Sequence, residues 1–387
     1  MNKSGVIIIE GHVQGLSNTR SLGEAGIPVW VIDREKCVAS SSKYCQKFFN
    51  CPAFTDDELA DFLIELAQKE KIKDWLLLPS NDHAVFTIAR NKQRLAEYFK
   101  IITDDLAIIN KIYDKSNLLS IAEKVGVPIP LTHYFHSKDE SIPSILTFPT
   151  LTKGKTGLSF YKSFKKKAFL ANTQNELKEQ LTVISKRVPL EETFTQELIP
   201  FNGTNKTLSF TAFCDKGEVK THWTGLKLRE HPIQFGTATF AKSVYVPELL
   251  EQSKLLLKEL NYTGICEVEY LQDPRSKEYK LIEINARSWL WVGLAKKCGV
   301  NYAKIAYDFV NNNPIDYPET YTKGVYWYNP ITDFIYSLIG ILKGKVRIGS
   351  YLKSTFFHKK ESALFQKGDL RPGFVYASKL VSFHKKR

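Results

Sequence analysis

Leu281-Ile-Glu-Ile-Asn-Ala-Arg287 is the stretch of sequence that does most to decide the fold of this 387-residue chain. Apolar and polar residues alternate through it, which is typical of a strand with one packed face. On this pattern Ile282 and Ile284 share the packed face, while Leu281, Glu283 and Asn285 share the other. We therefore expect Glu283 and Asn285 to point together into a polar site.

A second strand is predicted just before it, over residues 265–271, and a polar turn over 273–276 joins the two. Glu267 and Glu269 share one face of this strand. Paired as an antiparallel hairpin, the strands would bring two or three carboxylates and one amide oxygen to one point, and such hard oxygen ligands suit Mg²⁺. The alternative is a solvated sheet face whose acids are balanced by Lys277, Lys280 and Arg287.

Two lysines flank a glycine-bearing stretch earlier in the chain. Lys153 ends a predicted strand over 148–153, and Lys167 ends another over 160–169, with Gly154, Gly157 and Ser159 between them. Lysine charges and backbone N–H groups around such a loop can hold a polyphosphate. A solvated basic hairpin is the alternative interpretation.

Two further strands carry polar groups that could contact a ligand. Residues 196–200, Gln-Glu-Leu-Ile-Pro, could hydrogen-bond the edge of an adenine and pack on its face, although an ordinary edge strand has the same pattern. Lys227, Arg229 and His231 alternate along residues 226–232 and are expected on one face, where they could bind anionic oxygens. An exposed strand would look identical.

The N-terminal part reads as a parallel α/β sheet. A strand over 6–9, a tight loop from Gly11 to Gly15, a helix over 17–25 and a strand over 28–32 form a βαβ unit, and a later strand over 75–78 ends at Ser80-Asn81-Asp82. Ligands bind at the carboxyl ends of parallel strands, so we expect these two loops at one rim. The glycine pattern is not GxGxxG, which argues against a nicotinamide-dependent oxidoreductase.

Eight elements in order resemble the ATP-grasp superfamily, and more narrowly the carboxylate-amine ligases related to D-aspartate ligase and the carbamoyl-phosphate synthase large chain. The likeness covers about residues 5–315. The elements are Asp114-Lys115, Gly126-Val-Pro-Ile-Pro, Phe148-Pro149 to Lys153, Lys167-Ala168, Gln196-Glu197-x-Ile-Pro, Lys227-x-Arg229, Glu267-Val-Glu269-Tyr and Leu281-Ile-Glu-Ile-Asn-Ala-Arg287.

The resemblance implies a role for each matching residue. Lys115 would bind ATP, Lys153 and Lys167 would contact its phosphates, and Gln196, Glu197, Leu198 and Ile199 would hold the adenine. Glu269, Glu283 and Asn285 would bind Mg²⁺, two ions in all, with Mn²⁺ as a substitute. Arg287, Lys227 and Arg229 would stabilise phosphoryl and acyl-phosphate oxygens, and Gly11, Gly15, Ser80 and Asp82 would help to bind substrate.

The resemblance also implies a fold and a reaction. It predicts an N-terminal Rossmann-like pre-ATP-grasp domain (1–112), then a two-lobed ATP-grasp domain: a small lobe with a linker helix (113–200) and a large lobe with the metal site (201–315). Residues 316–387 would form a basic, aromatic C-terminal extension. The reaction would convert a small-molecule carboxylate, such as an amino acid, into an acyl phosphate and join it to an amine. A non-catalytic ATP-binding or sensor protein is the alternative, and a homodimer is left open.

Basic residues concentrate at the C-terminus. The net charge is +13, and residues 340–387 carry twelve Lys and Arg against Glu361 and Asp369, a net of +10. Aromatic residues interleave with them, which suits an anionic membrane surface, although a subdomain that packs its aromatics inward fits equally well. No recognition module for nucleic acid and no apolar run long enough for a signal peptide or a membrane span is present, so we expect a cytoplasmic protein, peripheral at most.

Overall fold

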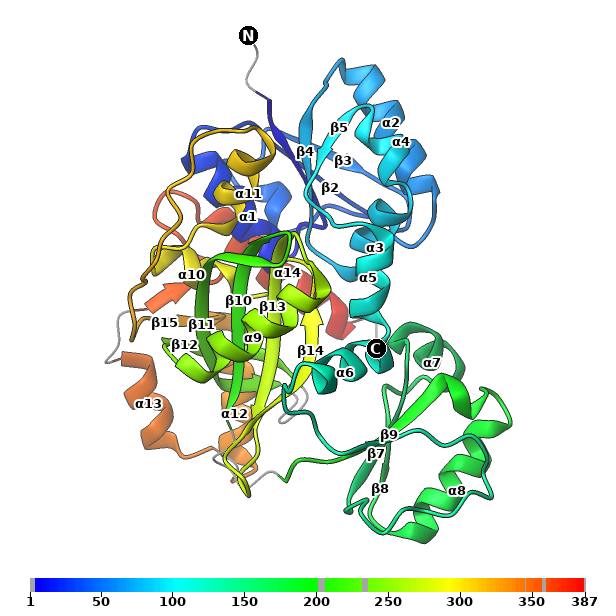
Figure 1. The fold of residues 1–387 in the computed structure, drawn as a ribbon. Helices are drawn as coiled ribbons and strands as arrows, with labels where there is room; N and C mark the ends of the chain where they lie inside the picture. The colour runs from blue at the N-terminus through cyan, green and yellow to red at the C-terminus, as the bar shows by residue number, and fades with distance from the viewer. Residues whose placement is uncertain (1–3, 201–205, 232–235, 345, 357–359, 386–387) are drawn as a thin grey trace.

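The computed structural model describes residues 4–200, 206–231, 236–344, 346–356 and 360–385. Within these ranges the strands form three sheets, which lie in separate parts of the molecule (Figure 1). The mixed α/β and α+β architecture expected from the sequence is confirmed. No helix of the described ranges has the length and apolar character that crossing a bilayer requires.

The N-terminal sheet has five parallel strands in the order β3-β2-β1-β4-β5. Its strands are β1 (Val6–Ile9), β2 (Val29–Asp33), β3 (Lys47–Asn50), β4 (Trp75–Pro79) and β5 (Phe99–Ile101). One face packs on α2 (Glu58–Glu70), α3 (Asp82–Arg90) and α4 (Lys92–Ala96). The other packs on α1 (Val13–Glu24).

The helix expected over 17–25 begins earlier, at Val13, so the predicted loop from Gly11 to Gly15 is shorter than expected. Gly15 lies in the first turn of the helix, where any side chain would collide with the carbonyl oxygen of Glu10. A side chain at Gly11 would collide with the sulfur of Cys37. Both glycines therefore allow the close approach of backbone and core, which is a sufficient physical reason for their presence.

Two helices connect this sheet to the rest of the chain: α5 (Leu106–Tyr113) and α6 (Lys115–Lys124). Asp114 lies between them and caps α6, because its carboxylate accepts hydrogen bonds from the backbone N–H groups of Ser116 and Asn117. The helix ends before Gly126, as the sequence predicts.

The small sheet has four strands in the order β6-β9-β7-β8. They are β6 (Thr132–His133), β7 (Thr150–Gly154), β8 (Phe169–Ala171) and β9 (Thr193–Glu197), with the helices α7 (Gly157–Phe164) and α8 (Gln174–Ser185) and the short turn η2 (Leu190–Glu192). The predicted strand over 160–169 is wrong, because its first half belongs to α7 and only Phe169 lies in a strand, β8. Phe160 and Phe164 stand one helical turn apart and both pack on Phe169, a spacing that favours the helix.

The large sheet has seven strands in the order β14-β13-β10-β11-β12-β15-β16. They are β10 (Thr207–Asp215), β11 (Glu218–His231), β12 (Thr237–Val244), β13 (Gly264–Gln272), β14 (Tyr279–Asn285), β15 (Tyr326–Tyr328) and β16 (Lys360–Ser362). Helix α9 (Pro247–Leu260) packs on one face. Helices α10 (Val292–Lys297) and α11 (Tyr302–Val310) pack between the other face and the N-terminal sheet.

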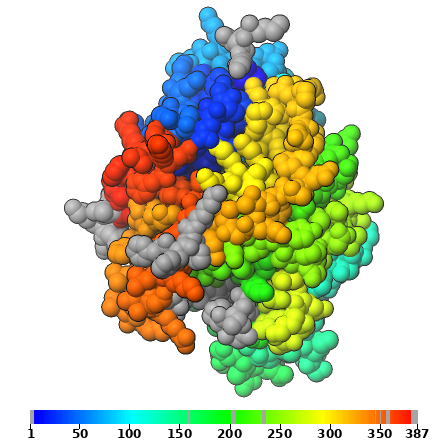
Figure 2. All heavy atoms as spheres, turned by 90° about the vertical axis from the view of Figure 1, so that its left-hand side faces the viewer, coloured from blue at the N-terminus to red at the C-terminus, as the bar shows by residue number. Residues whose placement is uncertain are grey.

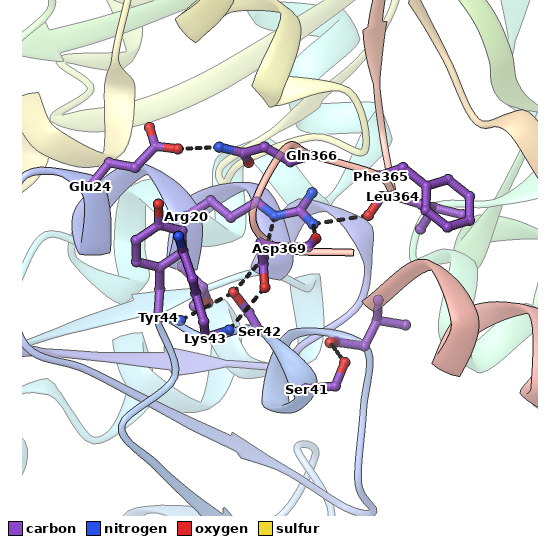
Figure 3. A network of polar contacts seen from close by, with 12 residues as sticks. Arg20, Glu24, Ser41, Ser42, Lys43, Tyr44, Leu364, Phe365, Gln366 and Asp369 are labelled. Carbon is purple, nitrogen blue, oxygen red and sulfur yellow. Dashed lines mark hydrogen bonds and ion pairs between the residues drawn. The ribbon is translucent and has the colours of Figure 1, made fainter. Parts of the chain in front are cut away.

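The C-terminal residues include two outer helices, α12 (Pro330–Leu342) and α13 (Ile348–Phe356), and a part around Leu364 and Asp369 that packs inward. Leu364 is fully buried, and the red C-terminal residues lie beside the blue N-terminal ones (Figure 2). A polar network holds them in place: Asp369 accepts hydrogen bonds from Arg20, from Ser42 and from the backbone N–H of Lys43 (Figure 3). Ser42 and Lys43 directly follow the short turn η1 (Ala39–Ser41). Phe365 packs against the core, as the inward-packing alternative expects, and so does Tyr376 in the following helix α14 (Arg371–Lys385), whereas Phe374 of the same helix is 66% exposed.

The buried ion pair of Arg20 and Asp369 yields a stability prediction. Their side chains are 6% and 2% exposed, and Arg20 also donates to the carbonyl of Leu364. Asp369→Asn should lower the free energy of unfolding by about 3 kcal/mol, because it leaves the guanidinium charge buried without a counter-charge. Urea unfolding followed by circular dichroism measures this. Glu259→Gln, which breaks an exposed pair with Lys124, is the matched control and should leave the urea midpoint unchanged.

Candidate active site

Strands β13 and β14 pair in the register that gathers the acidic residues. Glu267 lies opposite Asn285, and Glu269 lies opposite Glu283. The core takes the other face of β13, with Cys266, Val268 and Tyr270. The hairpin and its polar face are therefore as predicted.

One detail of this prediction is wrong. Leu281 does not share the face of Glu283: it is fully buried in the core beside Ile284. The register shifts so that Tyr270 pairs with Leu281 while Glu269 pairs with Glu283. A bulge at Ile282 turns Leu281 to the opposite face of the strand from the one that strict alternation predicts.

Lysines from two other elements neutralise the two carboxylates that face each other. The Nζ atom of Lys227, from β11, lies 3.0 Å from Glu269 Oε2, and the Nζ of Lys115, from α6, lies 3.2 Å from Glu283 Oε2. The charge of Lys115 lowers the pKa of Glu283 to about 2, against the effect of burial. Burial opposes the charge on Lys227, but Glu269 and Glu267 outweigh it and raise the pKa of that lysine.

Glu267 is the most enclosed acid of the group and is 2% exposed. Burial, followed by repulsion from Glu269, raises the pKa of Glu267 to about 8. Its oxygens accept hydrogen bonds from Ser209 Oγ at 2.6 Å and from Asn285 Nδ2 at 2.9 Å. Glu267 therefore positions Asn285, whose Oδ1 then faces Arg287.

Arg287 joins this hairpin to the N-terminal sheet. Its guanidinium donates to Asp82 with Nε at 2.6 Å and Nη2 at 3.1 Å, and to Asn285 Oδ1 at 3.1 Å. Tyr113 donates to the same Asp82 carboxylate at 2.6 Å. Asp82 begins α3, directly after β4, so the rim of the N-terminal sheet and the carboxylate cluster form one continuous polar site.

The rim contains further polar groups at the ends of β1 and β4, which are neighbours in the sheet. Gln14 donates to the Ser80 carbonyl at 2.8 Å and to Glu10 Oε2 at 3.1 Å. The Ser80 hydroxyl is buried and has no hydrogen-bond partner in the described ranges. Burial, aided by the charge of Asp33, raises the pKa of Glu10 to about 7.

The small sheet contributes Lys153 and Gln196. The Nζ atom of Lys153, on β7, lies 3.4 Å from Gln196 Oε1 on the neighbouring β9. Burial, with repulsion from Lys115, lowers the pKa of Lys153 to about 8, so the two lysines approach a common region. Such repulsion is relieved by an anion. Lys167 is exposed in the loop before β8, outside this group of contacts.

Glu197 has a different environment from the one its expected role requires. Its carboxylate accepts from Arg275 at 2.6 Å, Lys280 at 2.8 Å, the backbone of Leu131 at 3.0 Å and Thr147 at 3.1 Å. These contacts outweigh its burial and lower the pKa of Glu197 to about 2. The carboxylate thus fastens the small sheet to the β13–β14 turn. The N–H groups of Glu197 and Leu198 already donate to the carbonyls of Leu131 and Pro149, so a base would meet the half-buried Leu198 and the buried Ile199.

Arg229 is not brought to the carboxylate cluster. It forms two hydrogen bonds with Asp333, at 2.8 and 2.6 Å, and one with Ser354 at 2.7 Å. The register of β11 and β12 shifts between Lys227 and Arg229, because Leu228 is an extra residue there. This bulge separates two side chains that a regular strand would place on one face.

The sequence pattern did not assign Glu10, Arg275 or Lys280 to this site. Glu10 had a usable signal, because it directly follows a buried parallel strand at the carboxyl edge of the sheet. Arg275 and Lys280 had none: their partner Glu197 is 78 and 83 residues away.

The donor set fits a hard divalent cation in its chemistry. Glu269, Glu283 and Asn285 offer only oxygen ligands, as Mg²⁺ prefers. Over the ranges that the structure describes, no three His, Cys, Asp or Glu side chains are arranged to hold a metal ion. The predicted set contains two such residues and an amide, and Lys115 and Lys227 contact its carboxylates.

Comparison with known proteins places this geometry in context. A family model, "Carbamoyl-phosphate synthase L chain, ATP binding domain", matches residues 233–312. D-aspartate ligase of Enterococcus faecium (strain Aus0004) is 26% identical in a match 281 residues long, which covers 68% of this chain and 66% of that protein. The match thus spans just under two thirds of the length of the ligase.

Solved structures share the fold. L-amino acid ligase from Bacillus licheniformis has a TM-score of 0.60 at 14% identity, covering 80% of this chain and 75% of that one. The biotin carboxylase domain dimer of Hydrogenobacter thermophilus 2-oxoglutarate carboxylase, in complex with MgADP, ADP and bicarbonate, has a TM-score of 0.64 at 15% identity, covering 84% and 74%. The chain therefore has the ATP-grasp fold of these ligases and carboxylases and is similar in sequence to D-aspartate ligase.

Proposed function

We propose that this chain is an ATP-dependent carboxylate-amine ligase. It activates a substrate carboxylate, such as that of an amino acid, as an acyl phosphate and joins it to an amine, giving an amide, ADP and phosphate. The observation that carries this proposal is the register of β13 and β14, which sets Glu269 against Glu283 and Glu267 against Asn285 beside Lys115, Lys227 and Arg287. D-aspartate ligase and L-amino acid ligase, to which the chain is similar, support the reaction class.

The basic groups of the site suit an ATP phosphate chain. Lys153 and Lys115 repel each other in a buried region, and phosphate oxygens between them would relieve this repulsion. We assign the adenine to residues 196–199, beside Lys153. We also assign Lys167 to the phosphates, which it would reach from the exposed loop before β8. Residues 201–205, which follow Pro200 and could contact the ribose, lie outside the described residues.

Divalent metal belongs to the proposal as a cofactor. Glu269, Glu283 and Asn285 would hold Mg²⁺, two ions in all, with Mn²⁺ as a substitute. When bound, the metal would neutralise phosphate charge next to the carboxylates.

The residues of the rim would handle the substrates. Arg287 is anchored by Asp82 and can hold the substrate carboxylate while one of its oxygens bonds to the γ-phosphorus of ATP and ADP leaves. Ser80, Gly11 and Gly15 stand at the same rim, although the glycines serve packing. Glu10 can accept a proton from the ammonium form of the amine, because its pKa lies near neutrality.

The proposed organisation follows the sequence expectation: a pre-ATP-grasp domain over 1–112, a small lobe over 113–200, a large lobe over 201–315 and an extension over 316–387. We also propose that the reaction takes place in the cytoplasm, beside an anionic membrane surface.

A test of the ligase reaction measures ADP release with mixtures of amino acids as carboxylates and amines, followed by mass spectrometry of the product. Glu283→Gln should lower substrate-dependent ADP release more than 100-fold, because it removes the charge of a proposed Mg²⁺ ligand. Glu278→Gln, an exposed acid of the same hairpin, is the matched control and should keep full activity. Tight MgATP binding without substrate-stimulated ADP release would instead support a sensor.

The pH dependence tests Glu10. Below pH 7 this carboxyl is protonated and cannot take a proton from the amine, so kcat/KM for the amine should rise with pH and level off above about 7. Glu10→Gln should lower the rate about 100-fold and remove the rise. Glu35→Gln, an exposed acid beyond β2, should retain the wild-type profile. An unchanged profile in Glu10→Gln would refute the assignment.

A third test separates the two basic residues of β11. Lys227→Met should weaken MgATP binding, because it removes a positive charge that would face the phosphoryl oxygens and leaves Glu269 without its counter-charge. Arg229→Met should leave MgATP affinity unchanged but lower the free energy of unfolding by about 3 kcal/mol, because Asp333 loses its counter-charge while 5% exposed. Isothermal titration calorimetry and urea unfolding measure the two effects. Loss of ATP affinity in a folded Arg229→Met variant would restore the original catalytic prediction.

A further inference from the structure

Helix α12 (Pro330–Leu342) has inverted polarity. The side chains that it buries against the sheet belong to Asp333 and Ser337, with Gly340 on the same face. Its exposed face is apolar: Phe334 is 56% exposed, Ile335 38%, Leu338 46%, Ile339 39% and Leu342 79%. Amphipathic helices of water-soluble domains have the opposite arrangement.

The orientation of α12 is fixed by contacts on its buried face. Asp333 pairs with Arg229 and also accepts from Thr239 at 3.0 Å. A side chain at Gly340 would lie 2.6 Å from Val346 Cγ2, so the helix is held close to the segment that follows it. Rotating α12 to bury its leucines would break the Arg229–Asp333 pair.

The next helix, α13 (Ile348–Phe356), extends the exposed apolar face. Ile348 is 62% exposed and Leu352 47%. Arg229 holds this helix too, through its hydrogen bond to Ser354 and its position over the Tyr351 ring at 5.3 Å. We call the resulting patch the α12–α13 surface. Its members are Phe334, Ile335, Leu338, Ile339, Leu342, Ile348 and Leu352.

The charge around this surface has one sign. Residues 334–360 include six Lys and Arg but no Asp or Glu. Lys343, Arg347 and Lys353 are exposed beside the apolar side chains. A lipid bilayer with anionic headgroups is complementary to this combination of apolar side chains and basic rim.

A second copy of the chain is less complementary to the α12–α13 surface than an anionic membrane is. A symmetric dimer through this patch would bring the same basic residues of both copies together, and like charges at an interface are repulsive. The length of α12, 13 residues or about 20 Å, is too short to span a bilayer but suits a helix lying in its surface.

We propose that the α12–α13 surface docks this protein on an anionic membrane. This inference rests on the proposed function, which places the reaction beside an anionic membrane, and it deepens that function by naming the surface that contacts the membrane. It also moves the contact from the expected residues 340–387 to residues 330–356, because the stretch around Leu364 and Asp369 packs on the N-terminal sheet. In Figure 1, α12 and α13 lie at the end of the large sheet that is remote from the N-terminal sheet.

Sedimentation with lipid vesicles tests this proposal without ATP turnover. The full chain should bind vesicles of phosphatidylglycerol and phosphatidylcholine, bind weakly to phosphatidylcholine alone, and dissociate at high salt. The double variant Leu338→Ser, Leu342→Ser should lose about 100-fold in partition constant. The triple variant Lys343→Gln, Arg347→Gln, Lys353→Gln should lose a similar factor.

Controls separate this result from other causes. Leu255→Ser removes an equally exposed leucine on α9 and should bind vesicles like the wild type. Circular dichroism confirms that each variant is folded. ADP release in the absence of vesicles should be unchanged in the leucine variant, so a failure of lipid binding is distinguishable from a failure of the ligase proposal.

Two results would overturn the proposal. One is equal vesicle binding by the wild type and both surface variants, or binding by none of them. The other is a wild-type dimer, seen by sedimentation equilibrium without lipid, that the leucine variant converts to a monomer while vesicle binding is absent. That outcome would assign the surface to a second copy.

Discussion

Repulsion among acids on β13 and β14 is the constraint on which the arrangement of the chain depends. Glu267, Glu269 and Glu283 lie in adjacent register in a partly buried place, where like charges cannot all be ionised without compensation. Compensation comes from outside the hairpin: Lys227 from β11 and Lys115 from the linker helix α6. The fold of the large sheet and the position of the linker are therefore coupled to the same few carboxylates.

The two ends of this hairpin extend the coupling to the other sheets. At the turn, Arg275 and Lys280 bind Glu197 of the small sheet, and beyond the end of β14, Arg287 binds Asp82 beside the N-terminal sheet. Strand β14 has seven residues, so these two anchors stand about 20 Å apart. The polar face lies between them. An extended molecule bound along the hairpin, with a base at one end and a carboxylate at the other, would span this distance.

What the sequence could predict depends on how local the cause is. Alternation in residues 281–287 is a local property, and it predicted the strand and the direction of Glu283 and Asn285. The rim of the N-terminal sheet followed from parallel-sheet topology. The bulges at Ile282 and Leu228 depend on contacts with distant parts of the chain. The first lets Leu281 enter the core, and the second lets Arg229 pair with Asp333. The strand prediction is wrong over residues 160–164 because aromatic residues occur in both strands and helices. The contacts of Phe160 and Phe164 with Phe169 are made by the helix and are not visible in the local sequence.

The bulge in β11 allows one strand to serve two regions. Lys227 compensates the carboxylates, and Arg229, just past the extra residue, fixes α12 and α13 through Asp333 and Ser354. This second arrangement is not the most stable one for a chain in water. Burying Phe334, Leu338 and Leu342 would gain about 1.5–3 kcal/mol for each side chain, whereas a buried ion pair contributes little net stability. A helix that buries an acid and exposes its leucines therefore departs from the stability optimum, and such departures mark surfaces that a partner completes. The basic residues around this one restrict that partner to an anionic surface.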